Sequence, residues 1–163
     1  METTEQRLVL IGQGGIDGLE DALVRLGRLL EYRVVVIGHE PMLSAEPDQL
    51  LDDPDYDLGS FMFLESDSVA VLTHSEKDVD VLQAISRFKP RYVGLLGNRE
   101  RIKEGLAGLR ARGVDEKFVA SIKGPVGADI GARSPAEIAL SIMAEVVATK
   151  YGKRVLRKEF GSQ

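Results

Sequence analysis

Four short apolar runs stand out along the first hundred residues of the chain. They are RLVLIG (Arg7–Gly12), YRVVVIG (Tyr32–Gly38), SVAVLTH (Ser68–His74) and RYVGLLG (Arg91–Gly97). Valine, leucine and isoleucine dominate each run, with no strict alternation of apolar and polar positions. That pattern is typical of strands covered on both faces, as in a parallel sheet.

Helical periodicity separates these runs. Apolar residues recur at steps of three and four over 16–30, 81–88 and 102–109, giving each segment one apolar stripe. A last helix is expected from Ser134 to about Thr149, because Ser134, Pro135 and Glu137 form an N-cap, a first-turn proline and a capping-box carboxylate. Alternation of strand and helix predicts an α/β fold, a Rossmann-like three-layer sandwich with a mostly parallel sheet, as one domain over residues 1–163.

The last expected helix is apolar around most of its circumference. Its one consistent polar stripe is Glu137, Ser141 and Glu145. We therefore expect this helix to be buried by its own sheet and by a second subunit of a homodimer.

Two segments interrupt the alternation. The segment His39–Ser60 is acidic, and we expect a solvated crossover loop with a short helix around Gln49; a metal site or a surface for a basic partner is the alternative. From about residue 150 the tail is basic, with Lys153, Arg154 and Arg157, and a solvated end is expected.

Composition narrows the classes of function. The net charge of −5 argues against a nucleic-acid surface, and no apolar run approaches the length of a membrane span. The chain has no cysteine, which excludes disulfides and thiolate chemistry within it, and a cytoplasmic location is expected. No spacing of histidines suggests a protein-bound metal.

Candidate ligand-binding residues are those that follow the strands, since ligands of such folds bind beyond the carboxyl ends of the strands. Gly12, Gly14, Gly15 and Gly18 follow the first run and could bring backbone N–H groups close to a phosphate. Their spacing does not fit G-x-G-x-x-G, and Gly38 stands where a dinucleotide site would place an acid. A tight turn without ligand is the alternative.

The third and fourth strands end in polar groups. Thr73 and His74 offer a hydroxyl and an imidazole, and Gly97, Asn98 and Arg99 form a turn that could cap a helix and reach an anion. A structural hydrogen bond is the alternative for His74, and capping alone would explain Asn98.

The loop KGPVGADIGARSP (Lys123–Pro135) is rich in glycine and carries one acid. Lys123, Gly124 and Gly131 could frame an anion site before the last helix, with Asp129 beside them. The alternative is a structural loop that closes the domain.

Three segments, VLTHSEKDVDVLQA, YVGLLGNRERI and IKGPVGADIGARSPAEIALSIMAEVVA, together resemble the C-terminal domain of the XdhC/CoxI family. Members of that family are accessory proteins of molybdenum hydroxylases such as xanthine dehydrogenase. The resemblance implies a domain that binds the molybdenum cofactor (molybdopterin) and helps to insert it into an apo molybdenum hydroxylase. It maps onto Thr73, His74, Gly94, Gly97, Asn98, Arg99, Gly124, Pro125, Gly127, Asp129 and Gly131.

The sequence departs from the family pattern at three points. The cysteine-containing N-terminal domain of full-length members is absent from these residues, so a separate protein could supply it. The first turn reads GQGGIDG where the family has G-A-G-H-V-A, and Gly38 replaces the usual aspartate. We therefore expect molybdopterin rather than NAD(P) as the ligand; an NAD(P)-dependent oxidoreductase and a ligand-free oligomerisation module are the alternatives.

Overall fold

The computed structural model describes residues 5–12, 16–38, 43–73 and 75–157. Its elements in chain order are β1 (Arg7–Ile11), α1 (Leu19–Leu29), β2 (Arg33–Gly38), β3 (Gln49–Asp52), β4 (Ser68–Val71), α2 (Ser75–Ser86), β5 (Tyr92–Leu95), α3 (Arg99–Ala111), α4 (Glu116–Ser121) and α5 (Pro135–Lys150).

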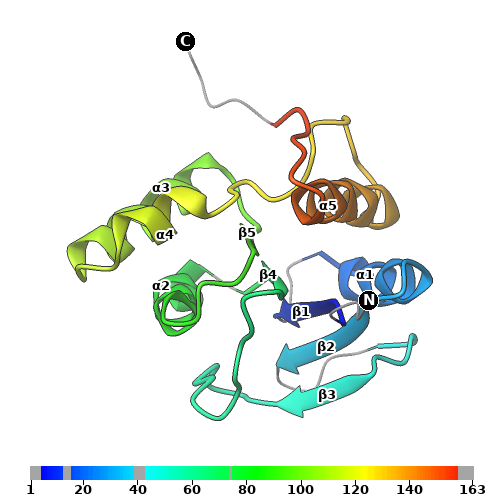
Figure 1. The fold of residues 1–163 in the computed structure, drawn as a ribbon, viewed down its shortest axis with the longest axis horizontal. Helices are drawn as coiled ribbons and strands as arrows, with labels where there is room; N and C mark the ends of the chain where they lie inside the picture. Colours follow the sequence, from blue (N-terminus) through cyan, green and yellow to red (C-terminus); the bar gives the residue numbers. More distant parts are fainter. Residues whose placement is uncertain (1–4, 13–15, 39–42, 74, 158–163) are drawn as a thin grey trace.

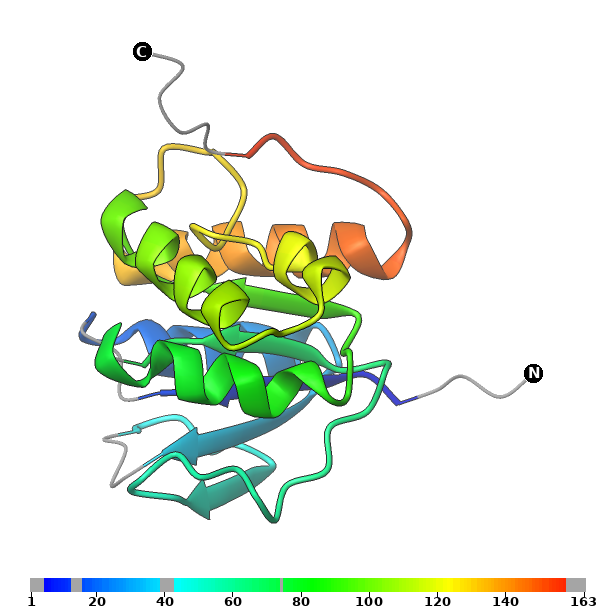
Figure 2. The ribbon, with the colours of Figure 1, turned by 90° about the vertical axis from the view of Figure 1, so that its left-hand side faces the viewer.

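The five strands form one parallel sheet in the order β3-β2-β1-β4-β5. Helices α1 and α5 cover one face, and α2, α3 and α4 lie on the other (Figures 1 and 2). The predicted Rossmann-like three-layer sandwich is confirmed, and the sheet is parallel throughout. None of the described helices is long and apolar enough to cross a membrane.

The central strands are buried on both faces, which explains their unbroken apolar runs. In β1, Leu8 and Leu10 pack with α1 and α5, whereas Val9 and Ile11 pack with α2 and α3. All four side chains are fully buried. Each strand residue therefore faces one of two cores, and no position in the middle of the strand favours a polar side chain.

The short helix expected around Gln49 is wrong, because Gln49–Asp52 forms the edge strand β3. It pairs with β2 from Val35↔Gln49 to Gly38↔Asp52. The Asp48 carboxylate accepts a hydrogen bond from the backbone N–H of Val34 at 2.8 Å, which fixes the start of this pairing. The strand depends on contacts with a distant segment, and local periodicity over four residues could not indicate it.

Helix α5 begins as expected, with the complete capping box of Ser134 and Glu137, and it ends at Lys150. Of the polar stripe of this helix, Glu137 is exposed, but the other two residues do not face solvent. Ser141 and Glu145 are each only 2 % exposed. Glu145 accepts hydrogen bonds from the Tyr92 hydroxyl (2.6 Å) and from the backbone N–H of Gly127 (3.0 Å).

The basic tail is exposed at Lys153 and Arg154, as expected of a solvated end, but it is docked at Arg157. Arg157 forms an ion pair with Glu145 and donates to the carbonyl oxygen of Pro125 at 3.2 Å. The preceding carbonyl, of Leu156, accepts from the backbone N–H of Asp129. Together these contacts fasten Leu156 and Arg157 to α5 and to the loop before it. Burial, the larger cause, and the neighbouring Glu145 carboxylate together raise the pKa of Tyr92 well above its ordinary value.

The segment 123–126 extends the sheet beyond β5. Lys123 donates to the carbonyl of Val93 and accepts from the N–H of Leu95, and Val126 donates to the carbonyl of Leu95. The outer edge of β5 is thus covered by backbone that runs parallel to it.

Candidate functional site

The carboxyl ends of β1, β2, β4 and β5 meet at one edge of the sheet, and α1, α2 and α3 begin directly after β1, β4 and β5. Helix α5 begins there too: a Cβ atom at Gly18, the N-cap of α1, would lie 3.8 Å from the Cβ of Pro135. We call this region the carboxyl edge. Gly14, Gly15 and His74, predicted from the sequence as ligand residues, lie outside the described residues.

The glycines that flank the first turn have distinct reasons to be glycine. Gly12 lies against β4, where a Cβ atom would come within 2.6 Å of the Cβ of Leu72. Gly18 adopts a left-handed conformation with φ of 86°, and α1 has no side-chain cap. In contrast, Asn98, Asp115 and Ser134 cap α3, α4 and α5 with their own side chains. Helix α1 therefore begins with backbone donors that no N-cap side chain serves.

Gly38 occupies the place of the missing ribose-binding acid, and the backbone closes that place. A Cβ atom there would lie 2.5 Å from the carbonyl oxygen of Gly12. The backbone N–H of Gly12 donates to the carbonyl of Ile37 at 3.0 Å, so this carbonyl belongs to a tightly joined β1–β2 pair. No side chain, and hence no carboxylate, fits at position 38 unless the two strand ends move apart.

Tyr56 is a residue of the carboxyl edge that the sequence did not single out. Its hydroxyl would lie 3.8 Å from a Cβ atom at Gly38. Asp53 holds the turn, since its carboxylate accepts from the N–H groups of Asp57 (3.0 Å) and Leu58 (2.8 Å). Tyr56 has φ of 52°, and burial, followed by the nearby Glu20 and Asp53 carboxylates, raises its pKa. Its phenol therefore stays neutral at neutral pH. In the sequence, the dipeptide Asp53-Pro54 indicates a turn here, but it does not indicate that Tyr56 reaches Gly38.

Thr73, Asp78 and Arg101 form a polar cluster after β4. The Thr73 hydroxyl donates to the Asp78 carboxylate at 3.2 Å, and Asp78 is only 1 % exposed. Arg101 forms an ion pair with Asp78 at 3.3 Å and donates to the carbonyl of Thr73. The cluster ties α2 and α3 to the end of β4, so the Thr73 side chain is committed to Asp78.

Arg101, rather than Arg99, reaches into this cluster. Asn98 accepts from the backbone N–H of Arg101 at 3.0 Å and so caps α3, as the sequence suggested. Gly97 makes room for the arginine, because a Cβ atom there would lie 3.1 Å from the Cβ of Arg101. Arg99, at the first position of the helix, is exposed.

The loop before α5 divides into two parts. Gly124 and Gly127 are packing positions: a Cβ atom at Gly124 would lie 2.8 Å from Ile102, and one at Gly127 would lie 2.5 Å from the Ser141 hydroxyl. Asp129 and Gly131 are exposed. Lys123 does not join Gly131 in one anion site, since it lines a cavity with Ala148 and Thr149 near the other end of α5.

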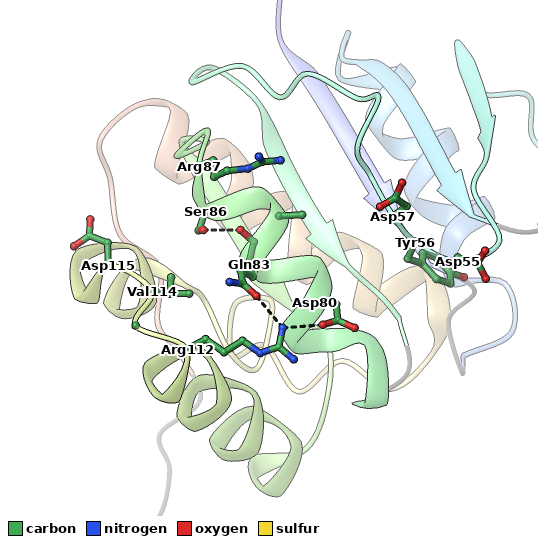
Figure 3. A pocket seen from close by; sticks show the side chains of 12 residues that line it. Asp55, Tyr56, Asp57, Asp80, Gln83, Ser86, Arg87, Arg112, Val114 and Asp115 are labelled. Atoms are coloured by element: carbon green, nitrogen blue, oxygen red, sulfur yellow. Dashed lines mark hydrogen bonds and ion pairs between the residues drawn. The ribbon is translucent and has the colours of Figure 1, made fainter.

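A large cavity shares Tyr56 with the carboxyl edge and extends from there along α2 (Figure 3). It measures about 860 Å³ and is lined by the 55–57 turn, one side of α2 and residues 112–115. Arg112 spans part of it and donates to Asp80 (2.7 Å) and Gln83 (2.8 Å). Its remaining charged lining is mainly acidic, which does not suit a phosphorylated cofactor.

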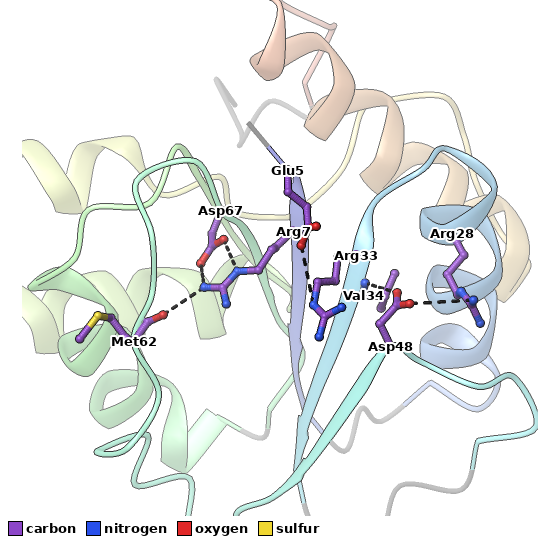
Figure 4. Close-up of polar contacts among 8 residues, drawn as sticks. All are labelled: Glu5, Arg7, Arg28, Arg33, Val34, Asp48, Met62 and Asp67. Carbon is purple, nitrogen blue, oxygen red and sulfur yellow. Dashed lines mark hydrogen bonds and ion pairs between the residues drawn. The ribbon is translucent and has the colours of Figure 1, made fainter. Parts of the chain in front are cut away.

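Ion pairs join the opposite, amino end of the sheet (Figure 4). Arg7 binds the fully buried Asp67 through two nitrogen atoms, at 2.8 and 2.6 Å, and also donates to the carbonyl of Met62. Arg28 lies 3.9 Å from Asp48, and Arg33 lies 3.8 Å from Glu5. These contacts fasten strands and loops, and they explain the charges at this end of the sheet without a ligand.

Strand order, parallel pairing and a glycine-rich connection from β1 to α1 define a Rossmann-type domain, with Gly38 at the position where a dinucleotide site has its ribose-binding acid. The XdhC Rossmann domain family model matches residues 8–146. The chain belongs to this family, and the resemblance found in the sequence is confirmed.

Relatives and solved structures agree with this assignment. The chain is 32 % identical over 156 residues to a probable xanthine dehydrogenase subunit of Bacillus subtilis, covering 91 % of this chain and 44 % of that protein. It is 29 % identical over 150 residues to the protein YqeB of Escherichia coli, covering 88 % of this chain and 27 % of that protein. The chain thus spans less than half the length of these relatives.

Among solved structures, a xanthine dehydrogenase (BH1974) from Bacillus halodurans matches with a TM-score of 0.76 and 25 % identity, over 93 % of this chain and 44 % of that one. A short-chain dehydrogenase/reductase from Veillonella parvula matches with a TM-score of 0.53 and 11 % identity, over 95 % of this chain and 99 % of that one, which shows the fold alone.

Proposed function

We propose that this domain is an accessory factor of a xanthine dehydrogenase-type molybdenum hydroxylase, and that it binds the molybdenum cofactor at the carboxyl edge and helps to insert it into the apo-enzyme. Membership of the XdhC family and the names of the relatives support the link to xanthine dehydrogenase. Cofactor binding is inferred from the carboxyl edge itself.

The observation that carries the proposal is the pair of glycines at the ends of β1 and β2. Gly38 has no room for a Cβ atom, so position 38 provides no carboxylate to hold the ribose hydroxyls of NAD. At the same edge α1 begins at Gly18 with no capping side chain. A ligand that offers a phosphate and no ribose diol matches both features, and molybdopterin is such a ligand.

The described residues fit the phosphate end of this cofactor. The first turn of α1 presents N–H groups and the positive end of the helix dipole, which favours a phosphate. Within residues 5–12, 16–38, 43–73 and 75–157, no group of three or more His, Asp or Glu side chains could hold a metal ion. The proposal therefore assigns to these residues the binding of the organic part of the cofactor. The complete cofactor, once inserted, supplies the redox-active molybdenum to the client enzyme.

Each side chain then has a limited task. Tyr56 presents a neutral phenol beside Gly38, where a carboxylate would repel a phosphate. The cluster of Thr73, Asp78 and Arg101 fixes the end of β4 and holds the strand ends in register. Arg99, exposed at the start of α3, is the cation we expect to approach the anionic ligand.

The test uses protein produced in a molybdenum-replete host, with native mass spectrometry for bound pterin and elemental analysis for molybdenum. The variant Gly18→Ala is compared with Gly113→Ala. Both glycines have positive φ, 86° and 75°, and neither position is crowded, so both variants carry a similar backbone strain of about 1–2 kcal/mol. Gly113 follows α3, whereas Gly18 begins α1.

We expect wild type and Gly113→Ala to carry pterin and Gly18→Ala to lose most of it. If wild type purifies with NAD(P) instead, the oxidoreductase alternative replaces the proposal. Equal pterin content in both glycine variants would place the cofactor away from α1.

A further inference from the structure

A second, smaller cavity lies between α5 and the C-terminal segment. It measures about 230 Å³ and is lined by Lys123, Glu145, Ala148, Thr149, Lys153, Arg154, Val155 and Arg157. Four of its eight lining residues are cationic and one is acidic, in a chain whose net charge is −5. The local charge is therefore opposite in sign to that of the whole protein.

The single acid is already committed. Glu145 receives hydrogen bonds from Tyr92 and Gly127 and pairs with Arg157. Lys123, Lys153 and Arg154 have no acidic partner among the described residues. Three positive charges thus surround one small space. Together they exceed the half negative charge that the C-terminal end of α5 presents, so the helix end alone does not account for them. The last carbonyls of that helix are also occupied, since residues 147–149 accept from the N–H groups of 151–153.

The backbone that carries these cations is fixed. Lys123 is joined to β5 by two backbone hydrogen bonds, and the N–H of Lys153 donates to the carbonyl of Ala148 at 2.8 Å. Arg157 is held by Glu145 and by its bridge to Ala128. Arg154 lies between these two anchored points. A site whose walls are positioned before binding loses less entropy when a ligand arrives.

The volume limits the ligand. Pockets for cofactor-sized molecules usually measure about 300–1,000 Å³, so this cavity is too small for a nucleotide or a pterin. We propose that it is a binding site for a tetrahedral oxyanion of the phosphate, sulfate and molybdate class. The site is separate from the carboxyl edge, because Ala148 lies roughly 20 Å along α5 from Pro135 at 1.5 Å per residue.

Titration calorimetry of the full chain in chloride buffer, with sodium phosphate, sulfate and molybdate in turn, tests the site. The variants Lys123→Gln and Arg154→Gln each remove one cation from the cavity, and Lys103→Gln removes an exposed lysine of α3 as the matched control. Loss of one charge-assisted hydrogen bond should weaken binding about tenfold. Backbone amide NMR of the wild type locates the site without any variant, by shifts at 148–149 and 153–155.

Saturable binding of at least one anion, weakened in both cavity variants and unchanged in Lys103→Gln, supports the site, and the preferred anion identifies the ligand. No saturable binding overturns it. Equal affinity in all variants, or NMR shifts spread over other surfaces, means an adventitious ion only and also overturns it. Because the probes are simple anions and the residues lie outside the carboxyl edge, the result is independent of whether molybdopterin binds.

Discussion

Removal of Arg157 isolates the value of the contact that fastens the C-terminal segment. Glu145 is 3 % exposed at its side chain, so Arg157→Leu leaves a buried carboxylate with only the Tyr92 hydroxyl and the Gly127 N–H as partners. Breaking a buried ion pair costs about 3–5 kcal/mol. Arg157 itself is 28 % exposed, so water recovers part of this cost, and we expect a loss of about 2–4 kcal/mol in the free energy of unfolding.

For a domain of this size the loss corresponds to a melting temperature lower by roughly 5–15 °C. Urea unfolding at pH 7, followed by circular dichroism, measures the loss in the free energy of unfolding. Arg110→Leu is the matched control, because Arg110 and Glu116 form the same kind of pair at 3.0 Å with side chains 50 % and 65 % exposed. That exposed pair should contribute little to stability, because water screens it.

The double variant Glu145→Gln, Arg157→Leu completes the cycle. The glutamine oxygen can still accept from Tyr92 and Gly127, while the unpaired buried charge is gone. We expect the double variant to be more stable than Arg157→Leu alone. The single variant Glu145→Gln is the remaining corner of the cycle. The reasoning fails if Arg157→Leu costs no more than Arg110→Leu, or if the losses of Arg157→Leu and Glu145→Gln add up to that of the double variant.

Two further outcomes follow from the described contacts, and two from sequence and exposure together. Burial opposes ionisation of Asp21, but hydrogen bonds from Ala45 and Ser44 outweigh burial and lower the pKa of the carboxyl group. The carboxylate therefore stabilises the fold above about pH 4, and this stabilisation is lost as the pH falls through the lowered pKa. Asp21→Asn should flatten the decline of the melting temperature in acid. Gly38→Asp should lower the melting temperature without creating measurable NAD binding in calorimetry, because its Cβ atom meets the Gly12 carbonyl; tight NAD binding in that variant would refute the account. Leu140, 52 % exposed on α5, should lie at the interface of the homodimer we propose, so light scattering should give a dimer for wild type and a 17.8 kDa monomer for Leu140→Glu. Arg99→Ala should weaken binding of the isolated cofactor about tenfold, with little change in melting temperature.

Local patterns predicted most of the fold because its central elements satisfy local rules. Apolar runs predict the four buried strands, and a capping box predicts the start of α5. The strand β3 and the docked tail depend instead on long-range contacts, among them Asp48 with the Val34 N–H and Arg157 with Glu145. Nothing in the neighbouring residues distinguishes such an acid or arginine from a solvated one.

The candidate site was predictable only in outline. The carboxyl edge follows from strand order, and the glycine at position 38 is visible in the sequence. The sequence does not show why that glycine is necessary, because the crowding by the Gly12 carbonyl arises only when the ends of β1 and β2 lie side by side. Likewise the turn of α3 decides that position 101, rather than 99, meets Asp78, and a left-handed residue at position 56 brings a tyrosine to an edge far from it in the chain.

The covering of β5 by residues 123–126 leaves the sheet with two unlike borders. On that side the ladder is already continued by the chain's own backbone, and Gly94 allows the close fit, since a Cβ atom there would lie 2.4 Å from Val126. On the other side, β3 pairs only with β2 within the described residues, and its Leu50 is half exposed. A strand that joins this sheet from outside the described residues, in the same chain or another, finds an open strand edge at β3, so that border is the one suited to growth of the sheet.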